Sequence, residues 1–183
     1  MKKLAFALAA SGALALGVPS TPAAAAIETY EAKMTAASAA AIARADMIEG
    51  FGPKRLKPGN YLWRDVPKSA GAERVVVSLS DQLAFLYRGE TLVAVTTIST
   101  GTNRNPTPTG IFNVLEKKQM HRSRKYDNAP MPFMQRIDRF GIALHAGHNP
   151  GHPASHGCIR LPAKFAAKLF TVTGVGTPVL IGA

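Results

Sequence analysis

Residues 144–162 read LHAGHNPGHPASHGCIRLP, and they hold four of the five histidines and the only cysteine of the chain. The four histidines are spaced three, four and four residues apart, which would line one face of a helix. A helix is excluded by the residues that break it: Gly147, Pro150, Gly151, Pro153 and Gly157. The stretch is therefore predicted to be a loop. Because it also lacks the paired-ligand spacings of zinc sites, we predict neither a metal nor a cofactor.

The same stretch is better suited to nucleophilic catalysis. A thiol attacks as its thiolate, and a nearby imidazole that accepts its proton makes that form available near neutral pH. A strand that ends at His145 would hold such a base while the loop brings Cys158 back to it. The attacked carbonyl becomes an oxyanion, which main-chain N–H groups beside the nucleophile commonly stabilise. Gly157 lets the chain turn tightly and aim consecutive N–H groups into one pocket.

Each of these residues also has a purely structural interpretation. Cys158 would be a small apolar side chain in the core, although its neighbours favour catalysis. His156 matters more for its backbone than for its ring, and Ser155 would brace the turn by hydrogen bonding. His148 and His152 are interpreted as exposed loop residues.

The chain after residue 72 predicts a mainly β domain. Its short β-branched and alternating segments favour strands at 74–80, 83–87, 91–99, 111–115, 133–137, 141–146 and 177–181. One helix is predicted between the last two strands, with Pro162 near its first turn. Residues 117–132 form a polar insertion with five basic residues. It is interpreted either as a solvated loop or as a cover for the active-site cleft that meets substrate carboxylates.

The first residues predict export. A basic start, an apolar stretch from Leu4 to Val18 and a run of alanines form a signal peptide at 1–26, with an uncleaved anchor as the alternative. Residues 27–70 are predicted to be a helical segment and linker, which packs on the domain or spaces it from the membrane. The apolar positions of its helix follow a loose helical pattern: Met34, Ala37, Ile42, Met47 and Ile48.

The composition sets limits on partners. The chain has 183 residues, 46% hydrophobic and 18% charged residues, and a net charge of +11, which is typical of a basic globular protein. Such a protein is attracted to polyanions. Export argues against nucleic acid and favours anionic wall polymers, acidic stem peptides or lipid headgroups. A single cysteine excludes an intrachain disulfide.

The string from Ser155 to Leu161, preceded by the segment from Ile142 to His145, resembles the signature of the L,D-transpeptidase catalytic domain (YkuD) family. Upstream, Ser99-Thr100-Gly101 and the segment from Pro106 to Phe112 resemble the strand-loop-strand segment of that family. The resemblance covers residues 71–183, which are predicted to be the catalytic domain, and it leaves the first 70 residues uncovered.

This resemblance implies a YkuD-like β-sandwich with one or two short helices and a cleft that holds the cysteine. By position, it makes Cys158 the nucleophile and His145 the general base. The main-chain N–H groups of His156, Gly157 and Cys158 form the oxyanion hole, with Ser155 in support. Arg160 either forms an internal salt bridge or meets a substrate carboxylate.

The implied enzyme is a periplasmic or cell-wall-associated transferase that acts on peptidoglycan stem peptides. The thiolate attacks the carbonyl of the third stem residue, D-Ala leaves, and the thioester passes to an amine to give a 3→3 crosslink. Other acceptors in related proteins are a free D-amino acid, an outer-membrane lipoprotein, or water, which makes the enzyme a carboxypeptidase. Carbapenems acylate the same cysteine across the family. The alternative from another class is a non-catalytic wall-binding module.

Two features depart from the family pattern. The stretch between His145 and Ser155 is short, which leaves His148 or His152 as alternative bases. Residue 146 is alanine, where many members carry a hydroxyl side chain. A backbone carbonyl is therefore expected to orient the imidazole.

Overall fold

The computed structural model describes residues 26–183, so the predicted signal peptide at 1–26 lies outside them apart from its last residue. In chain order the elements are α1 (Tyr30–Phe51), β1 (Tyr61–Trp63), the 3-10 helix η1 (Lys68–Ala70), β2 (Glu73–Ser78), β3 (Leu83–Arg88), β4 (Thr91–Thr97), β5 (Gly110–Asn113), β6 (Glu116–Arg122), β7 (Pro130–Arg136), β8 (Ala143–Ala146), β9 (Ile159–Leu161), α2 (Ala163–Val172) and β10 (Pro178–Gly182). The predicted mainly β fold, with an N-terminal helix and a short helix near the C-terminal end, is confirmed.

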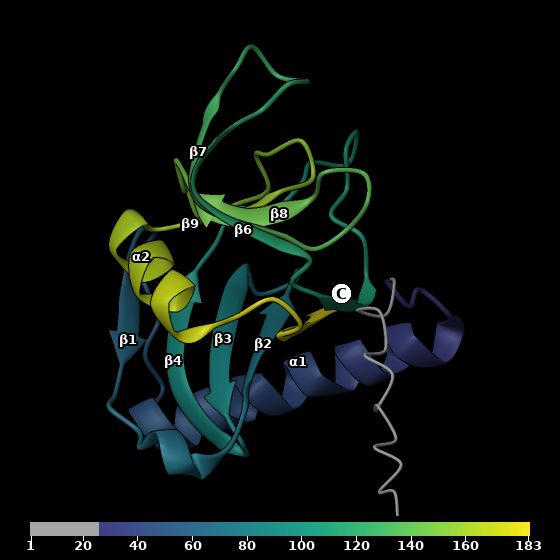
Figure 1. Cartoon of the computed structure of the whole chain (residues 1–183). Helices are drawn as coiled ribbons and strands as arrows, with labels where there is room; N and C mark the ends of the chain where they lie inside the picture. Colours follow the sequence, from purple (N-terminus) through teal and green to yellow (C-terminus); the bar gives the residue numbers. More distant parts are fainter. Residues whose placement is uncertain (1–25) are drawn as a thin grey trace, which may run out of the picture.

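The strands form two sheets. A six-stranded sheet has the order β1-β4-β3-β2-β10-β5, and a four-stranded sheet has the order β6-β7-β8-β9. Strands β2 and β10 pair in parallel, as do β8 and β9, and the other pairs are antiparallel. Figure 1 shows α1 along one side of the six-stranded sheet and the four-stranded sheet on its other side.

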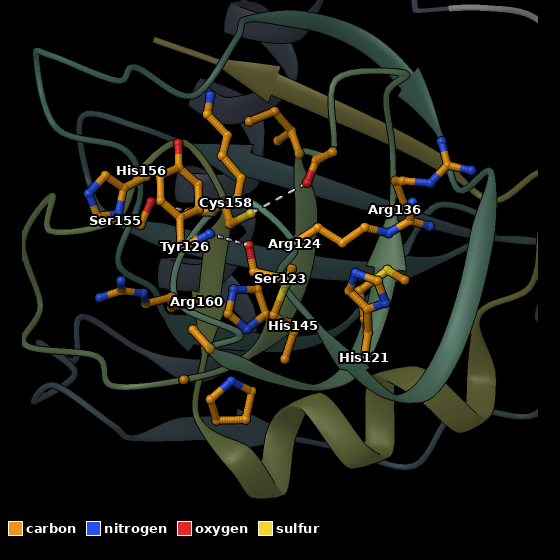
Figure 2. Close-up of a pocket in the computed structure, with 18 of the residues that line it drawn as sticks. His121, Ser123, Arg124, Tyr126, Arg136, His145, Ser155, His156, Cys158 and Arg160 are labelled. Carbon is orange, nitrogen blue, oxygen red and sulfur yellow. Dashed lines mark hydrogen bonds between the residues drawn. The ribbon is translucent and has the colours of Figure 1, made fainter.

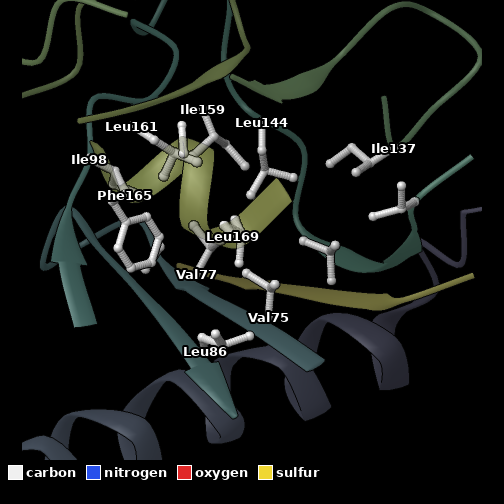
Figure 3. Close-up of a cluster of buried hydrophobic side chains, with 14 of the residues drawn as sticks. Val75, Val77, Leu86, Ile98, Ile137, Leu144, Ile159, Leu161, Phe165 and Leu169 are labelled. Carbon is white, nitrogen blue, oxygen red and sulfur yellow. The ribbon is translucent and has the colours of Figure 1, made fainter. Parts of the chain in front are cut away.

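The six-stranded sheet is buried on both faces, which explains the continuous apolar runs in its central strands. Successive side chains of a strand point to opposite faces. Val75 and Val77 face the main core together with Phe165 of α2 (Figure 3). Val76, between them, packs with Met47 on the α1 side. A strand with a single buried face would alternate apolar and polar residues instead.

Helix α1 packs on the sheet, as the first of its two predicted roles requires. The Thr29 hydroxyl accepts a hydrogen bond from the N–H of Ala32 and caps the helix. Its buried face is made mostly of small residues: Ala32, Ala36, Ala40, Ala43 and Met47. The helix approaches β10 so closely that a Cβ on Gly182 would lie 2.6 Å from the carbonyl oxygen of Ala36. Small residues are therefore needed at this contact. Of the apolar positions read from the sequence, Met47 is buried, whereas Met34, Ile42 and Ile48 are exposed, so the pattern indicated the buried face only in part.

Two regions predicted to be irregular contain strands. Residues 54–72, expected to be a linker or an extended strap, include β1, which pairs with β4. The insertion at 117–132, interpreted as a loop, forms β6 and the start of β7. Polar residues can form these strands because the side chains from Lys118 to Met120 are exposed, so they need no apolar alternation. The short strand β9, inside the cysteine motif, was also not predicted.

Candidate active site

Cys158 and His145 come from neighbouring parallel strands. His145 lies within β8, Cys158 immediately precedes β9, and the register pairs Leu144 with Ile159. Both side chains line one cavity of about 1120 Å³, shown in Figure 2. The pairing of β9 with β8 therefore brings together two residues that are separated in the sequence by the whole glycine- and proline-rich loop.

The loop that carries the cysteine is fixed to the segment after β4. Ser99 and Arg160 exchange main-chain hydrogen bonds of 3.0 and 2.9 Å. The N–H of Ser155 donates to the carbonyl oxygen of Thr100, and the N–H of Thr102 donates to that of Ser155. In the sequence, the Ser-Thr-Gly string at 99–101 was linked to the cysteine motif only through resemblance. In the structure, this segment forms hydrogen bonds with residues before and after Cys158.

Thr107 ties a second loop to the same place. Its hydroxyl donates to the carbonyl oxygen of Gly157 over 2.7 Å and accepts from the N–H of Gly101 over 2.9 Å. Gly157 itself has a φ of +112°, and a Cβ there would lie 2.6 Å from Cδ1 of Ile142. The conformation therefore requires glycine next to the cysteine, whereas the Ile142 side chain could move to relieve the contact.

Ser155 braces the turn from within. Its buried hydroxyl donates to the carbonyl oxygen of Cys158 over 2.5 Å and accepts from the N–H of Gly157 over 3.1 Å. The N–H of Gly157 is thus occupied by a protein partner. Of the three N–H groups expected in an oxyanion hole, those of His156 and Cys158 are left as candidates.

The ring of His145 is oriented by the main chain. Nδ1 lies 2.8 Å from the carbonyl oxygen of Ala146, and a carbonyl only accepts, so Nδ1 carries the hydrogen and Nε2 is left with a lone pair. Burial lowers the pKa of His145, and the nearby Arg160 and His121 lower it further, against the opposing effect of the Ala146 carbonyl. The ring is therefore neutral near pH 7 and able to accept a proton.

The surroundings of Cys158 favour a neutral thiol. Burial raises the pKa of Cys158, and Asp138 raises it further, while a main-chain hydrogen bond and Arg160 act in the opposite direction. The sulfur donates to the carbonyl oxygen of Gly141 over 3.7 Å, and no hydrogen bond to His145 is found among the described residues. For the imidazole to accept the proton, the sulfur must turn from Gly141 towards His145. Hydrogen bonds between catalytic groups are often unformed in sites without substrate and form when the substrate binds.

The cavity is strongly basic. Lys118 and Arg136 are paired with Glu116 at 2.7 and 2.9 Å, and these hydrogen bonds lower the pKa of Glu116 to about 2. Four other cations line the cavity and have no ion pair with any described residue: Arg124, Lys125, Arg139 and Arg160. For Arg160, the sequence allowed either an internal salt bridge or a contact with a substrate carboxylate. The structure shows no ion pair between Arg160 and any described residue.

The β6–β7 connection forms one wall of this cavity. Tyr126 stacks on His156 of the cysteine loop, with ring centroids 4.4 Å apart and an interplanar angle of 22°. The second interpretation of the insertion, a cover over the cleft, therefore fits its position. Lys117 belongs to the insertion but does not face the cavity. Its ammonium group donates to the carbonyl oxygens of Phe170 and Thr173 at the C-terminal end of α2.

The remaining histidines separate into two groups. His148 is exposed at the edge of the cavity, and His152 is exposed outside it. His121 lines the cavity from β6, a position that sequence reasoning missed because it lies in the insertion, far from the motif. Within residues 26–183, no three His, Cys, Asp or Glu side chains are grouped closely enough to hold a metal ion.

Several solved structures that resemble this chain are L,D-transpeptidases. One from Mycobacterium smegmatis has 21% identity and a TM-score of 0.57, over 61% of this chain and 58% of its own. L,D-transpeptidase 3 from Mycobacterium tuberculosis, in complex with a faropenem-derived adduct, has 21% identity and a TM-score of 0.56, over 61% and 60%. One from Enterococcus faecium has 25% identity and a TM-score of 0.53, over 60% and 49%.

This chain therefore spans less than two thirds of the length of these relatives. No curated protein matches the sequence. The family model of the L,D-transpeptidase catalytic domain (YkuD) matches residues 72–181, which is more than half of the 183 residues. The chain belongs to the L,D-transpeptidase catalytic domain (YkuD) family.

Proposed function

We propose that this protein is a peptidoglycan L,D-transpeptidase, with Cys158 as its nucleophile and His145 as its general base. The observation that carries the proposal is the pair of side chains on β8 and the start of β9, which face one basic cavity. The Nδ1 hydrogen of His145 is held by Ala146, which leaves Nε2 to accept a proton.

In the first step, the sulfur leaves the carbonyl of Gly141 and gives its proton to Nε2 of His145. The thiolate attacks the carbonyl carbon of the third stem residue. The N–H groups of His156 and Cys158 stabilise the oxyanion. His145 then passes its proton to the nitrogen of the departing D-Ala, and a thioester remains on Cys158. A neutral thiol and a neutral imidazole suit this sequence, because the proton moves only when the substrate is in place.

The substrate class follows from charge. Stem peptides carry several carboxylates, and the cavity offers four cations without ion pairs, including Arg160 beside the reacting groups. Arg160 lowers the pKa of both His145 and Cys158, which places its positive charge near both. We assign it to a substrate carboxylate, since guanidinium groups bind carboxylates in a bidentate manner.

The second step determines the product. An amine of a neighbouring stem gives a 3→3 crosslink, a D-amino acid gives exchange, an outer-membrane lipoprotein gives anchoring, and water gives a carboxypeptidase. We favour transfer to an amine, with the β6–β7 connection as one wall of the site that receives it. A binding module without catalysis would have no need for the hydrogen bonds that hold the cysteine loop.

The same proposal extends to the organisation of the chain. Residues 71–183 form the catalytic domain, 27–70 a helical segment and linker that packs on it, and 1–26 a signal peptide that directs export to the periplasm or cell wall. The match at residues 72–181 supports the catalytic boundaries. In the part of the chain that the structure describes, no helix is long and apolar enough to cross a membrane.

The test is incubation of the protein with a tetrapeptide stem, followed by mass analysis of the products. Release of D-Ala together with a 3→3 crosslinked dimer is expected, and the tripeptide alone would indicate a carboxypeptidase. Cys158→Ala serves as the control and should yield neither product. If the wild-type protein releases no D-Ala, the proposed function is wrong.

A further inference from the structure

His121 is a second imidazole in the cavity, and the reaction described above does not use it. It is the one half-buried residue among residues 118–122 of β6, whose other side chains are exposed. It lines the same cavity as Cys158 and His145, and Figure 2 shows its ring among the labelled cavity side chains. No described residue forms a hydrogen bond with this ring, so both of its nitrogens are available to a substrate.

The hairpin has a local irregularity two residues from His121. The pairing of β6 with β7 is interrupted between Lys118 and Met120, opposite Phe133. Phe133 has a φ of +55°, which is strained for a bulky residue, and its ring packs against Phe170 of α2. The register is the same on both sides of this gap, and His121 is paired with Met131 across the hairpin.

The two imidazoles influence each other. A positive charge on His121 lowers the pKa of His145, so the two rings lie near enough to interact. Charged groups from the same strand and from neighbouring elements also face the cavity, among them Glu116, Asp127, Arg124, Arg136, Arg139 and Arg160. The cations that line the cavity outnumber its two carboxylates, Glu116 and Asp127.

A proton balance shows where a second base can act. An acceptor amine reaches the thioester as an ammonium ion, and it must lose one proton before it can attack. It loses a second proton as the amide forms, and His145 returns that one to the sulfur of Cys158. The first proton must pass to water or to a second base in the cavity. In the acylation step the amine departs neutral, with the proton that came from the thiol, and it takes up a further proton only to become an ammonium ion.

We propose that His121 holds this extra proton: it takes one from the incoming ammonium group and returns it to the next leaving amine. In acylation, imidazolium at His121 protonates the released amine and becomes neutral. In transfer, neutral His121 deprotonates the acceptor ammonium, the amine attacks, and the C–S bond breaks. The cycle then restarts with no net gain or loss of protons. This inference rests on the proposed function.

The test compares acceptors that compete for one acyl-enzyme. The wild-type protein and His121→Gln are incubated with a tetrapeptide stem, D-methionine and hydroxylamine. Near neutral pH, D-methionine carries an ammonium group, whereas hydroxylamine is uncharged. The ratio of the two products does not depend on the rate of acylation. In the variant, this ratio should fall by about 100-fold, should recover as pH rises, and should recover with added imidazole.

His152→Gln is the matched control, because this histidine is exposed and lies outside the cavity. Acylation by a carbapenem, which releases no amine, shows that each variant is folded, and His121→Ser is used if the Gln variant is not acylated. An unchanged product ratio in the variant, or an equal loss of both products, would overturn the inference. If the wild-type protein forms no acyl-enzyme, the proposed function and this inference both fail.

Discussion

The hydroxyl of Thr107 donates a 2.7 Å hydrogen bond to the carbonyl oxygen of Gly157, across 50 residues of sequence. This single contact joins the Pro-Thr-Pro-Thr-Gly loop to the residue that precedes the nucleophile. It explains in physical terms why two strings that are distant in the sequence belong to one site.

Thr107→Val should test this contact. The substitution keeps the shape of the side chain but leaves the buried carbonyl of Gly157 and the N–H of Gly101 without their partner, at a cost of about 1–3 kcal/mol in the free energy of unfolding. Misplacement of Cys158 should also slow its acylation by about 10-fold or more. Urea unfolding and stopped-flow acylation measure the two effects. Thr109→Val, from the same loop, should change neither quantity, and equal effects from both variants would contradict this role.

His145→Gln should remove the base while preserving most of the side-chain volume. Acylation by a tetrapeptide stem is expected to slow by about 100-fold or more, because no other group accepts the thiol proton. His148→Gln, at the exposed edge of the cavity, should keep most of the rate. If the His148 variant is inactive and the His145 variant is active, the assignment of the base is reversed.

The alkylation of Cys158 by iodoacetamide should report a neutral thiol. Burial raises the pKa of this thiol, so its apparent value should exceed that of a free cysteine, about 8.5. The alkylation rate at neutral pH should be low and should rise as the solution becomes more alkaline. Rapid alkylation with an apparent pKa below neutrality would instead show a thiolate–imidazolium pair at rest.

The acid limb of the acylation rate should report His145. Protonation removes the base, so the rate falls as pH drops through the pKa of His145, which burial lowers. The midpoint of that limb is therefore expected below about 6.5, the ordinary value for an imidazole. Acylation rates between mildly acidic and neutral pH measure it, and a midpoint above 6.5 would contradict the assignment.

Much of the site could be predicted from residues 144–162. Glycines and prolines excluded a helix, and the residues around Cys158 matched one family closely enough to name nucleophile and base. The expected carbonyl that orients the imidazole is that of Ala146. The local sequence did not predict the hydrogen bond from the N–H of Gly157 to the hydroxyl of Ser155. This bond takes one of the three expected oxyanion donors. A string of residues does not show which N–H groups are already bound.

The cavity wall was harder to predict for a different reason. Residues 117–132 read as a loop because exposed strands have no apolar alternation. Their pairing depends on contacts with β8, through β7, and not on local propensity. His121 was missed for the same reason, since only the hairpin brings it near His145.

The face of α1 shows the limit of hydrophobic patterns. Apart from Met47, the buried side chains are alanines, because the helix lies close to the sheet, whereas Met34 and Ile42 are exposed. Met47→Ala should therefore cost about 2–5 kcal/mol in the free energy of unfolding. Met34→Ala, on the exposed face of the same helix, should change it by less than about 0.5 kcal/mol. Thermal and urea unfolding measure both, and equal effects would show that α1 does not pack as described.

The most direct test of the whole account is the intact mass of the protein after incubation with a carbapenem. A shift by the mass of one carbapenem molecule, mapped by peptide digestion to Cys158 and absent from Cys158→Ala, is the predicted result. A folded wild-type protein that keeps its original mass, or an adduct on another residue, would contradict the assignment of this cysteine as the nucleophile.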